Sequence, residues 1–206
     1  MASRLLIASL LAFAFCLLAE SCYGTVLFSS LQRTLVVTAS PKDGQVLRAG
    51  EDKITVTWGM NQSFPVGTDE AYKKVKVQLC YAPISQKDRG WRKTKDDLSK
   101  DKTCQFDIVA RAYDSNQPSF DWTIERDVPT ATYFVRAYAY NSDGQQVAFG
   151  QSTDGQKKTN LFDIQGISGR HASLDIAAGC FSAFSVLSLF GFFLVEKRKA
   201  KVSQKS

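Results

Sequence analysis

The sequence predicts an all-β fold, an antiparallel β-sandwich, joined to one membrane-spanning helix near the C-terminus. Three observations support this prediction. Seven short runs alternate polar and apolar residues, twenty consecutive residues near the C-terminus carry no charge, and the N-terminus holds a short apolar run typical of a secretory signal. The seven runs lie between the two apolar segments, so we expect the sandwich to occupy the middle of the chain.

The first 24 residues are predicted to be a cleaved signal peptide. Arg4 is followed by an apolar run from Leu5 to Ala19 and then by small and polar residues up to Gly24, which is the pattern of a secretory signal. The alternative is an uncleaved anchor helix, but the run is shorter than the roughly 20 residues that a membrane span needs. We therefore expect residues 25–170 to lie outside the cell.

Residues 25–170 are expected to form one β-sandwich domain. Turn residues at 40–44 and 141–144 separate runs of period 2, and in one such run Ile54, Val56 and Trp58 share a face. No convincing helix is expected in this domain. The predicted strands cover residues 34–40, 53–58, 73–81, 104–113, 119–125, 132–140 and 146–152.

Two local features narrow the fold prediction. The segment DVPTATYFVRAYAYNSDG, residues 127–144, resembles the corner and the following strand of fibronectin type III and related domains, with Tyr133 at the corner tyrosine. Trp58, which ends an early strand, resembles the core tryptophan of the same group. The expected fold class is therefore an immunoglobulin/fibronectin type III-like antiparallel β-sandwich, a fold that by itself does not fix a function.

The cysteines predict one disulfide. Cys16 and Cys22 leave with the signal peptide, and Cys180 lies within the predicted membrane helix. Cys80 and Cys104 remain in an oxidising compartment, so we expect them to pair. Cys80 is out of phase with the apolar residues of its strand, Val75, Val77, Leu79 and Tyr81. The bridge is therefore expected to point away from the core and to hold down residues 81–104.

One N-glycosylation sequon, Asn61-Gln62-Ser63, follows a predicted strand. On the expected extracellular side, Asn61 is a candidate glycan attachment site. The alternative is an unused sequon beside Phe64-Pro65.

The C-terminal region predicts a type I single-span membrane protein. Residues 171–175 form a juxtamembrane segment, and residues 176–195 contain no charge and cover about 30 Å as a helix. The tail, residues 196–206, carries five Lys or Arg residues against Glu196, so it is expected in the cytoplasm. The formal net charge is +6, but the tail carries most of it, so a nucleic-acid partner is not expected.

The sequence offers no constellation for catalysis or metal binding. The single histidine, His171, stands at the membrane boundary without the context of a catalytic triad. Clusters of His and Cys, Gly-rich phosphate loops and nucleophile motifs are missing from the sequence. We therefore expect a protein that is not an enzyme and that has no catalytic, cofactor or metal site.

A more specific resemblance lies in DRGWRKTKDDLSKDKTCQF, residues 88–106, and in QLCYAPISQ before it. With the signal peptide, the sandwich and the anchor, these segments make the whole chain resemble the plant nitrate-transport accessory family. The resemblance implies a non-catalytic subunit of a hetero-oligomer with a high-affinity nitrate transporter of the major facilitator type. It implies roles in the plasma-membrane targeting, stability and uptake activity of that transporter. No small-molecule substrate of its own is expected.

The charged stretch within residues 88–106 supplies a candidate contact surface. A connection of about 20 residues in a compact domain is usually functional or disordered, and the disulfide argues against disorder. We expect Arg92, Asp101 and the aromatic Trp91 to face the transporter. The alternative for this stretch is a solvated charged loop, and the rival function for the whole chain is a cell-surface adhesion or co-receptor protein.

Overall fold

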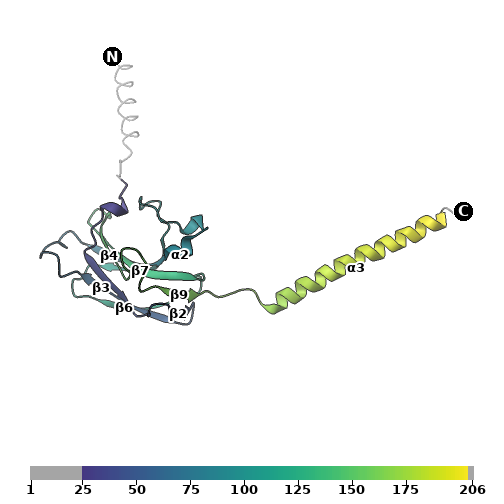
Figure 1. The fold of residues 1–206 in the computed structure, drawn as a ribbon, viewed down its shortest axis with the longest axis horizontal. Helices are drawn as coiled ribbons and strands as arrows, with labels where there is room; N and C mark the ends of the chain where they lie inside the picture. The colour runs from purple at the N-terminus through teal and green to yellow at the C-terminus, as the bar shows by residue number, and fades with distance from the viewer. Residues whose placement is uncertain (1–24, 204–206) are drawn as a thin grey trace, which may run out of the picture. The chain divides into compact units, whose positions relative to one another are not determined.

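The computed structural model describes residues 25–203, with side chains described as far as residue 199. The predicted signal peptide, residues 1–24, lies outside the described residues. The described chain divides after Gly166 into a β-sandwich domain and a C-terminal helical unit, and each is described by itself (Figure 1).

Two sheets form the sandwich (Figure 1). The smaller sheet has the order β1-β3-β6 and is antiparallel throughout, with β1 at Leu35–Ala39, β3 at Lys53–Met60 and β6 at Ser119–Thr123. The larger sheet has the order β2-β9-β7-β4-β5, and β8 also pairs with β7. Its strands are β2 Val46–Arg48, β4 Lys74–Tyr81, β5 Cys104–Ala112, β7 Ala131–Tyr140, β8 Gln146–Gln151 and β9 Phe162–Gln165.

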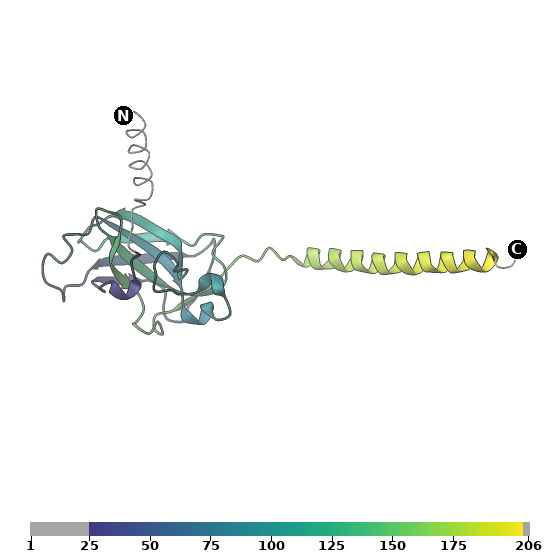
Figure 2. The ribbon, with the colours of Figure 1, turned by 90° about the horizontal axis from the view of Figure 1, so that it is seen from above.

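All seven predicted strands are present, and the fold class is confirmed. Two further strands, β2 and β9, were not predicted, and they pair in parallel between distant parts of the chain. The expectation of no helix was wrong in detail, because three single-turn helices occur: η1 at Phe28–Ser30, α2 at Pro83–Gln86 and η2 at Gly90–Arg92. The helices α2 and η2 lie at the same end of the sandwich as β9 (Figure 2).

The core lies between the two sheets and follows the predicted alternation. Ile54, Val56 and Trp58 on β3 face Val75 and the apolar residues that follow it on β4, and all of these side chains are buried. Burial of each aliphatic side chain contributes about 1.5–3 kcal/mol relative to exposure. These residues therefore supply a large share of the apolar burial that drives folding.

Tyr133 occupies the predicted corner. Its ring is fully buried, and its hydroxyl donates a 2.6 Å hydrogen bond to the backbone oxygen of Pro129, four residues upstream. This local bond pins the turn before β7 to the start of that strand. Burial raises the pKa of the Tyr133 hydroxyl, so the donor stays protonated.

The C-terminal unit contains one long helix, α3, at Ala172–Ser203. The helix extends beyond the predicted span of 176–195 at both ends. Within its segment Ala172–Lys199, an 18-residue stretch reaches a mean hydropathy of 2.0, and α3 is the only helix of the described residues long and apolar enough to cross a bilayer. Asp175 lies in its first turn and pairs with Arg170 at 3.0 Å. This helix fits a single-pass membrane protein.

A candidate partner-binding surface

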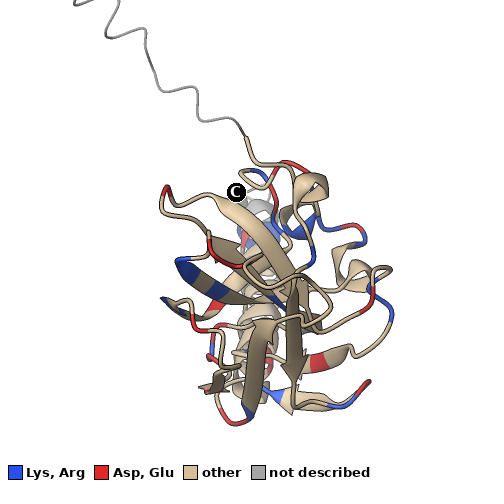
Figure 3. Cartoon of the chain, turned by 90° about the vertical axis from the view of Figure 1, so that its left-hand side faces the viewer, with Lys and Arg blue, Asp and Glu red and all other residues tan. Residues whose placement is uncertain are grey.

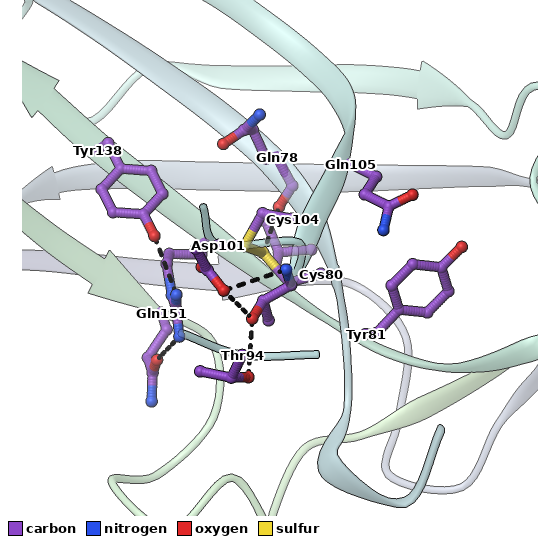
Figure 4. Close-up of a disulfide and its surroundings, with 12 residues drawn as sticks. Gln78, Cys80, Tyr81, Thr94, Asp101, Cys104, Gln105, Tyr138 and Gln151 are labelled. Atoms are coloured by element: carbon purple, nitrogen blue, oxygen red, sulfur yellow. Dashed lines mark hydrogen bonds between the residues drawn. A yellow bond between two sulfur atoms is a disulfide. The ribbon is translucent and has the colours of Figure 1, made fainter. Parts of the chain in front are cut away.

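The disulfide-closed loop, residues 82–103, connects β4 to β5. Cys80 and Cys104 are opposite each other on these neighbouring strands, and the structure contains the predicted disulfide between them (Figure 4). As expected, the bridge is not part of the main core. Cys80 is nevertheless 0% exposed, because it packs in a small separate cluster with Ala82 and Phe134. The bridge therefore closes the loop within one sheet and does not join the two sheets.

Gln86 and Thr94 hold the two halves of the loop together. The Gln86 side-chain amide donates to the backbone oxygen of Tyr81 at 2.9 Å, and its oxygen accepts from the backbone N–H of Thr94 at 3.0 Å. Because Gln86 is the last residue of α2 and Thr94 follows η2, one side chain links both short helices to the end of β4. The loop is thus an ordered element.

Asp101 organises the second half of the loop. Its Oδ1 accepts from the backbone N–H groups of Lys95 at 3.0 Å and Thr103 at 3.2 Å, and from the Thr103 hydroxyl at 2.7 Å (Figure 4). The Thr94 hydroxyl lies 2.7 Å from the Thr103 hydroxyl and donates to the Gln86 side-chain oxygen at 2.8 Å. Asp101 therefore shapes the loop from within.

Arg92 does not present its side chain to solvent, contrary to the expectation that it faces a partner. The residue is 7% exposed, and its guanidinium lies 4.3 Å from the centroid of the Tyr81 ring. Tyr81 in turn stacks on Tyr133 at 5.0 Å between centroids. A planar, weakly hydrated guanidinium suits this stacked position. Arg92 therefore anchors η2 onto the sandwich.

Trp91, the neighbour of Arg92 in η2, has the opposite environment. It is 60% exposed, while its backbone oxygen accepts a 2.6 Å hydrogen bond from the side-chain amide of Gln105. The burial of Arg92 and the bond from Gln105 fix the main chain on which the indole stands. The result is a large apolar ring in solvent on an ordered base, a feature common at protein interfaces.

The N-terminal segment, residues 26–30, pairs with the loop through an isolated antiparallel bridge between Leu27 and Asp97, which the sequence did not predict. The backbone N–H of Phe28 donates to Asp96 O at 2.7 Å, and that of Leu98 donates to Val26 O at 3.0 Å. Ser29 reinforces the pairing, because its N–H and hydroxyl donate to the two carboxylate oxygens of Asp96, each at 2.8 Å. The N-terminal segment and the loop thus form one surface.

Phe28 also ties this surface to a buried arginine on β7. Arg136 is 1% exposed, and its guanidinium lies 4.4 Å from the Phe28 ring centroid. It donates to the Tyr138 hydroxyl at 2.9 Å and to the Gln151 side-chain oxygen at 3.1 Å. Aromatic faces and neutral acceptors stabilise this cation in place of a carboxylate. Displacement of Phe28 would expose the Arg136 guanidinium, which the fold otherwise shields from water.

The charges on the surface are mixed. Asp97 pairs with Lys100 at 2.8 Å and accepts from Ser99, and the Lys100 hydrogen bond is the largest cause that lowers the pKa of Asp97 to about 2. Basic and acidic residues are interspersed along the strands and loops in Figure 3.

One protein-family model and several plant proteins are similar to this chain. The family model described as "High-affinity nitrate transporter accessory, Ig-like domain" matches residues 28–169. The chain is 53% identical to "High-affinity nitrate transporter 3.1" of Arabidopsis thaliana over 98% of this chain and 97% of that protein. It is 56% identical to "High-affinity nitrate transporter 3.2" of the same plant, over 87% of each.

A rice relative carries a more explicit name. The chain is 54% identical to "High-affinity nitrate transporter-activating protein 2.1" of Oryza sativa subsp. japonica, over 84% of this chain and 82% of that protein. The family model covers the whole sandwich, including the disulfide-closed loop. The chain therefore belongs to the family of high-affinity nitrate transporter accessory proteins with an immunoglobulin-like domain.

Proposed function

We propose that this chain is a non-catalytic subunit that binds a high-affinity nitrate transporter of the major facilitator type in a hetero-oligomer. In this role it supports the targeting of the transporter to the plasma membrane, its stability there and its uptake of nitrate. The observation that carries the proposal is family membership, with a rice relative whose name describes transporter activation. The nitrate path belongs to the partner, since one helix cannot enclose a pore.

The proposed contact surface consists of the disulfide-closed loop and the N-terminal segment. Trp91 is the direct anchor, because it combines a large exposed ring with a fixed backbone. Arg92 and Asp101 act indirectly: Arg92 holds η2 against Tyr81, and Asp101 fixes the turn that follows Lys95. The surrounding charges of both signs suit the polar rim of an interface.

The proposed topology is a type I single-pass protein at the plasma membrane. Helix α3 serves as the anchor, with the sandwich outside the cell and the basic tail in the cytoplasm. The Cys80–Cys104 disulfide supports the extracellular placement, because such bonds persist in oxidising compartments.

Co-expression tests the function. A major-facilitator nitrate transporter is expressed with and without this chain in cells that lack nitrate uptake, and both labelled nitrate uptake and surface transporter are measured. We expect uptake and surface transporter to rise strongly when the chain is present. Equal uptake with and without the chain would contradict the proposal and favour the adhesion or co-receptor function.

A second experiment tests the contact surface. Trp91→Ala is expected to reduce co-purification with the transporter while leaving the unfolding temperature of the sandwich unchanged. Val66→Ala is the matched control, because Val66 is fully exposed on the β3–β4 connection, away from the loop. Arg92→Ala and Asp101→Asn are expected to lower both co-purification and stability. Full co-purification of the Trp91 variant would remove the indole from the interface.

A further inference from the structure

We propose that an N-linked glycan on Asn61 lies in the groove beside β1 and covers the free edge of that strand. This proposal is independent of the proposed transporter contact, and it requires that Asn61 is glycosylated. It gives the glycan a structural role, protection of an edge strand, on the side of the sandwich where β1 faces residues 151–160.

Strand β1 is an outer strand of the smaller sheet. It pairs with β3 along its whole length and stands at the end of the order β1-β3-β6. Within residues 25–203, no backbone hydrogen bond joins residues 36–39 to the facing segment 151–160. Val36 is 45% exposed on this strand. An exposed edge with an apolar side chain is a template for pairing with another chain unless something covers it.

A groove opens along this edge. Gly150 on β8 meets the backbone of Leu35 so closely that a Cβ atom there would clash with the Leu35 oxygen. Beyond this contact, β1 and residues 151–160 enclose a groove of about 470 Å³. Val36 and Thr38 line one side of it, and Ser152, Thr153 and Asn160 line the other. Hydroxyl and amide groups on this lining can donate and accept, as the hydroxyl groups of a sugar require.

The facing wall of the groove is held in place. Arg33 donates to the backbone oxygens of Gln151 at 3.1 Å and of Thr153 at 2.8 Å. The side-chain amide of Asn160 donates to Ser152 O at 3.2 Å. The groove is therefore formed by the fold itself, before any occupant enters.

Asn61 lines the same groove. It follows Met60, the last residue of β3, which is opposite Leu35 in the sheet. Its Oδ1 accepts from the backbone N–H of Ser63 at 3.0 Å, while within the described chain no hydrogen bond engages Nδ2. Glycosylation forms the bond between Nδ2 and sugar C1, breaks the bond from C1 to a lipid diphosphate and releases one proton. The attached sugars then start at the Leu35 end of the groove that Val36 and Thr38 also line.

The test compares Ser63→Ala with Ser63→Thr in the full chain, expressed in eukaryotic secretory cells and purified in detergent. Both variants keep the turn, because the turn bond uses the Ser63 backbone N–H. Only Ser63→Thr keeps the sequon. We expect wild type and Ser63→Thr to migrate more slowly on gels than Ser63→Ala and to lose this difference after glycan removal by an amidase.

Backbone amide hydrogen exchange then tests whether the glycan covers the edge of β1. We expect the amides of residues 36–39 to exchange several-fold faster in Ser63→Ala than in wild type, while β6, the opposite edge of the same sheet, is unchanged. If Ser63→Ala self-associates and the added substitution Val36→Lys reverses the association, the result would support the protective role. It would mean that without the glycan a second copy of the chain pairs with the edge of β1. A wild-type chain without glycan, or a glycosylated chain with the same exchange at residues 36–39 as Ser63→Ala, would overturn the inference.

Discussion

The guanidinium of Arg92 lies 4.3 Å from the centroid of the Tyr81 ring and connects the proposed contact surface to the core. Tyr81 stacks on Tyr133, whose hydroxyl closes the corner with Pro129. The loop that carries the exposed Trp91 is therefore supported by the same aromatic column that stabilises the sandwich. Substitutions of Arg92 or Tyr133 are therefore expected to change the stability of the fold, whereas substitution of Trp91 is expected to change only the contact surface.

Arg92→Ala is expected to lower the free energy of unfolding by about 1–2 kcal/mol, because the variant loses a desolvated cation–π contact and the packing of the side-chain stem. Arg92→Lys retains the charge but not the planar stack, so it is expected to recover part of the loss. Arg89→Ala is the matched control, since Arg89 is exposed in the same loop. Thermal unfolding followed by tryptophan fluorescence measures all three, and an unchanged Arg92→Ala would refute the anchoring role.

Tyr133→Phe is expected to cost about 1–3 kcal/mol of unfolding free energy. The buried ring remains packed, but the backbone oxygen of Pro129 loses its donor at a partly buried position. Tyr140→Phe serves as the control, because within residues 25–203 the Tyr140 hydroxyl takes part only in a 3.5 Å contact with Gln146. Denaturant unfolding compares the two variants, and equal stabilities would contradict a structural role for the corner bond.

Removal of the disulfide is expected to destabilise the sandwich by about 3 kcal/mol, since the bond closes a loop with a sequence separation of 24. The paired variant Cys80→Ala/Cys104→Ala leaves no unpaired thiol. Cys180→Ala, in α3, is the control and is expected to have no effect on the sandwich. Unfolding midpoints with and without reductant provide the measurement. If reductant lowers the midpoint of the paired variant as much as that of wild type, the Cys80–Cys104 bond is not the source of the stabilisation.

Local sequence patterns were sufficient for most of the fold. The period-2 runs predicted seven strands, and Tyr133 was placed correctly because its hydrogen bond is with a residue four positions away. Strands β2 and β9 were missed because three or four residues are too short to show a period. Their parallel pairing also joins segments more than a hundred residues apart in the chain, and such pairing has no local signature.

The contact surface was only partly predictable. A charged stretch that ends in Cys104 indicated an ordered loop, but the sequence could not distinguish the buried Arg92 from the exposed Trp91. Burial of Arg92 depends on Tyr81, which lies at the end of another element. The pairing of Ser29 with Asp96 spans 67 positions and depends on tertiary structure alone.

Acid is expected to weaken the turn at Asp97. The pKa of Asp97 is lowered from 3.8 to about 2, first by its hydrogen bond with Lys100 and then by Ser99. A lowered pKa means that the folded state favours the carboxylate, so this stabilisation is complete above about pH 4 and is lost as the pH falls towards 2. Carbon-detected NMR titration of Asp97 measures the value. Lys100→Gln is expected to raise it towards 3.8, and an unchanged value would assign the shift to Ser99.

Asp96→Ala is expected to release the N-terminal segment from the disulfide-closed loop. The variant removes the acceptors of the Ser29 N–H and hydroxyl, while the backbone oxygen that pairs with Phe28 remains. We therefore expect local opening of residues 26–30, which would uncover Arg136, with little change in the global unfolding temperature. Limited proteolysis measures the opening as cleavage several-fold faster than in wild type. Lys95→Ala is the control, because only the backbone of Lys95 contributes to the loop. Equal cleavage of the two variants would show that backbone pairing alone holds the segment and that the Asp96 carboxylate is dispensable.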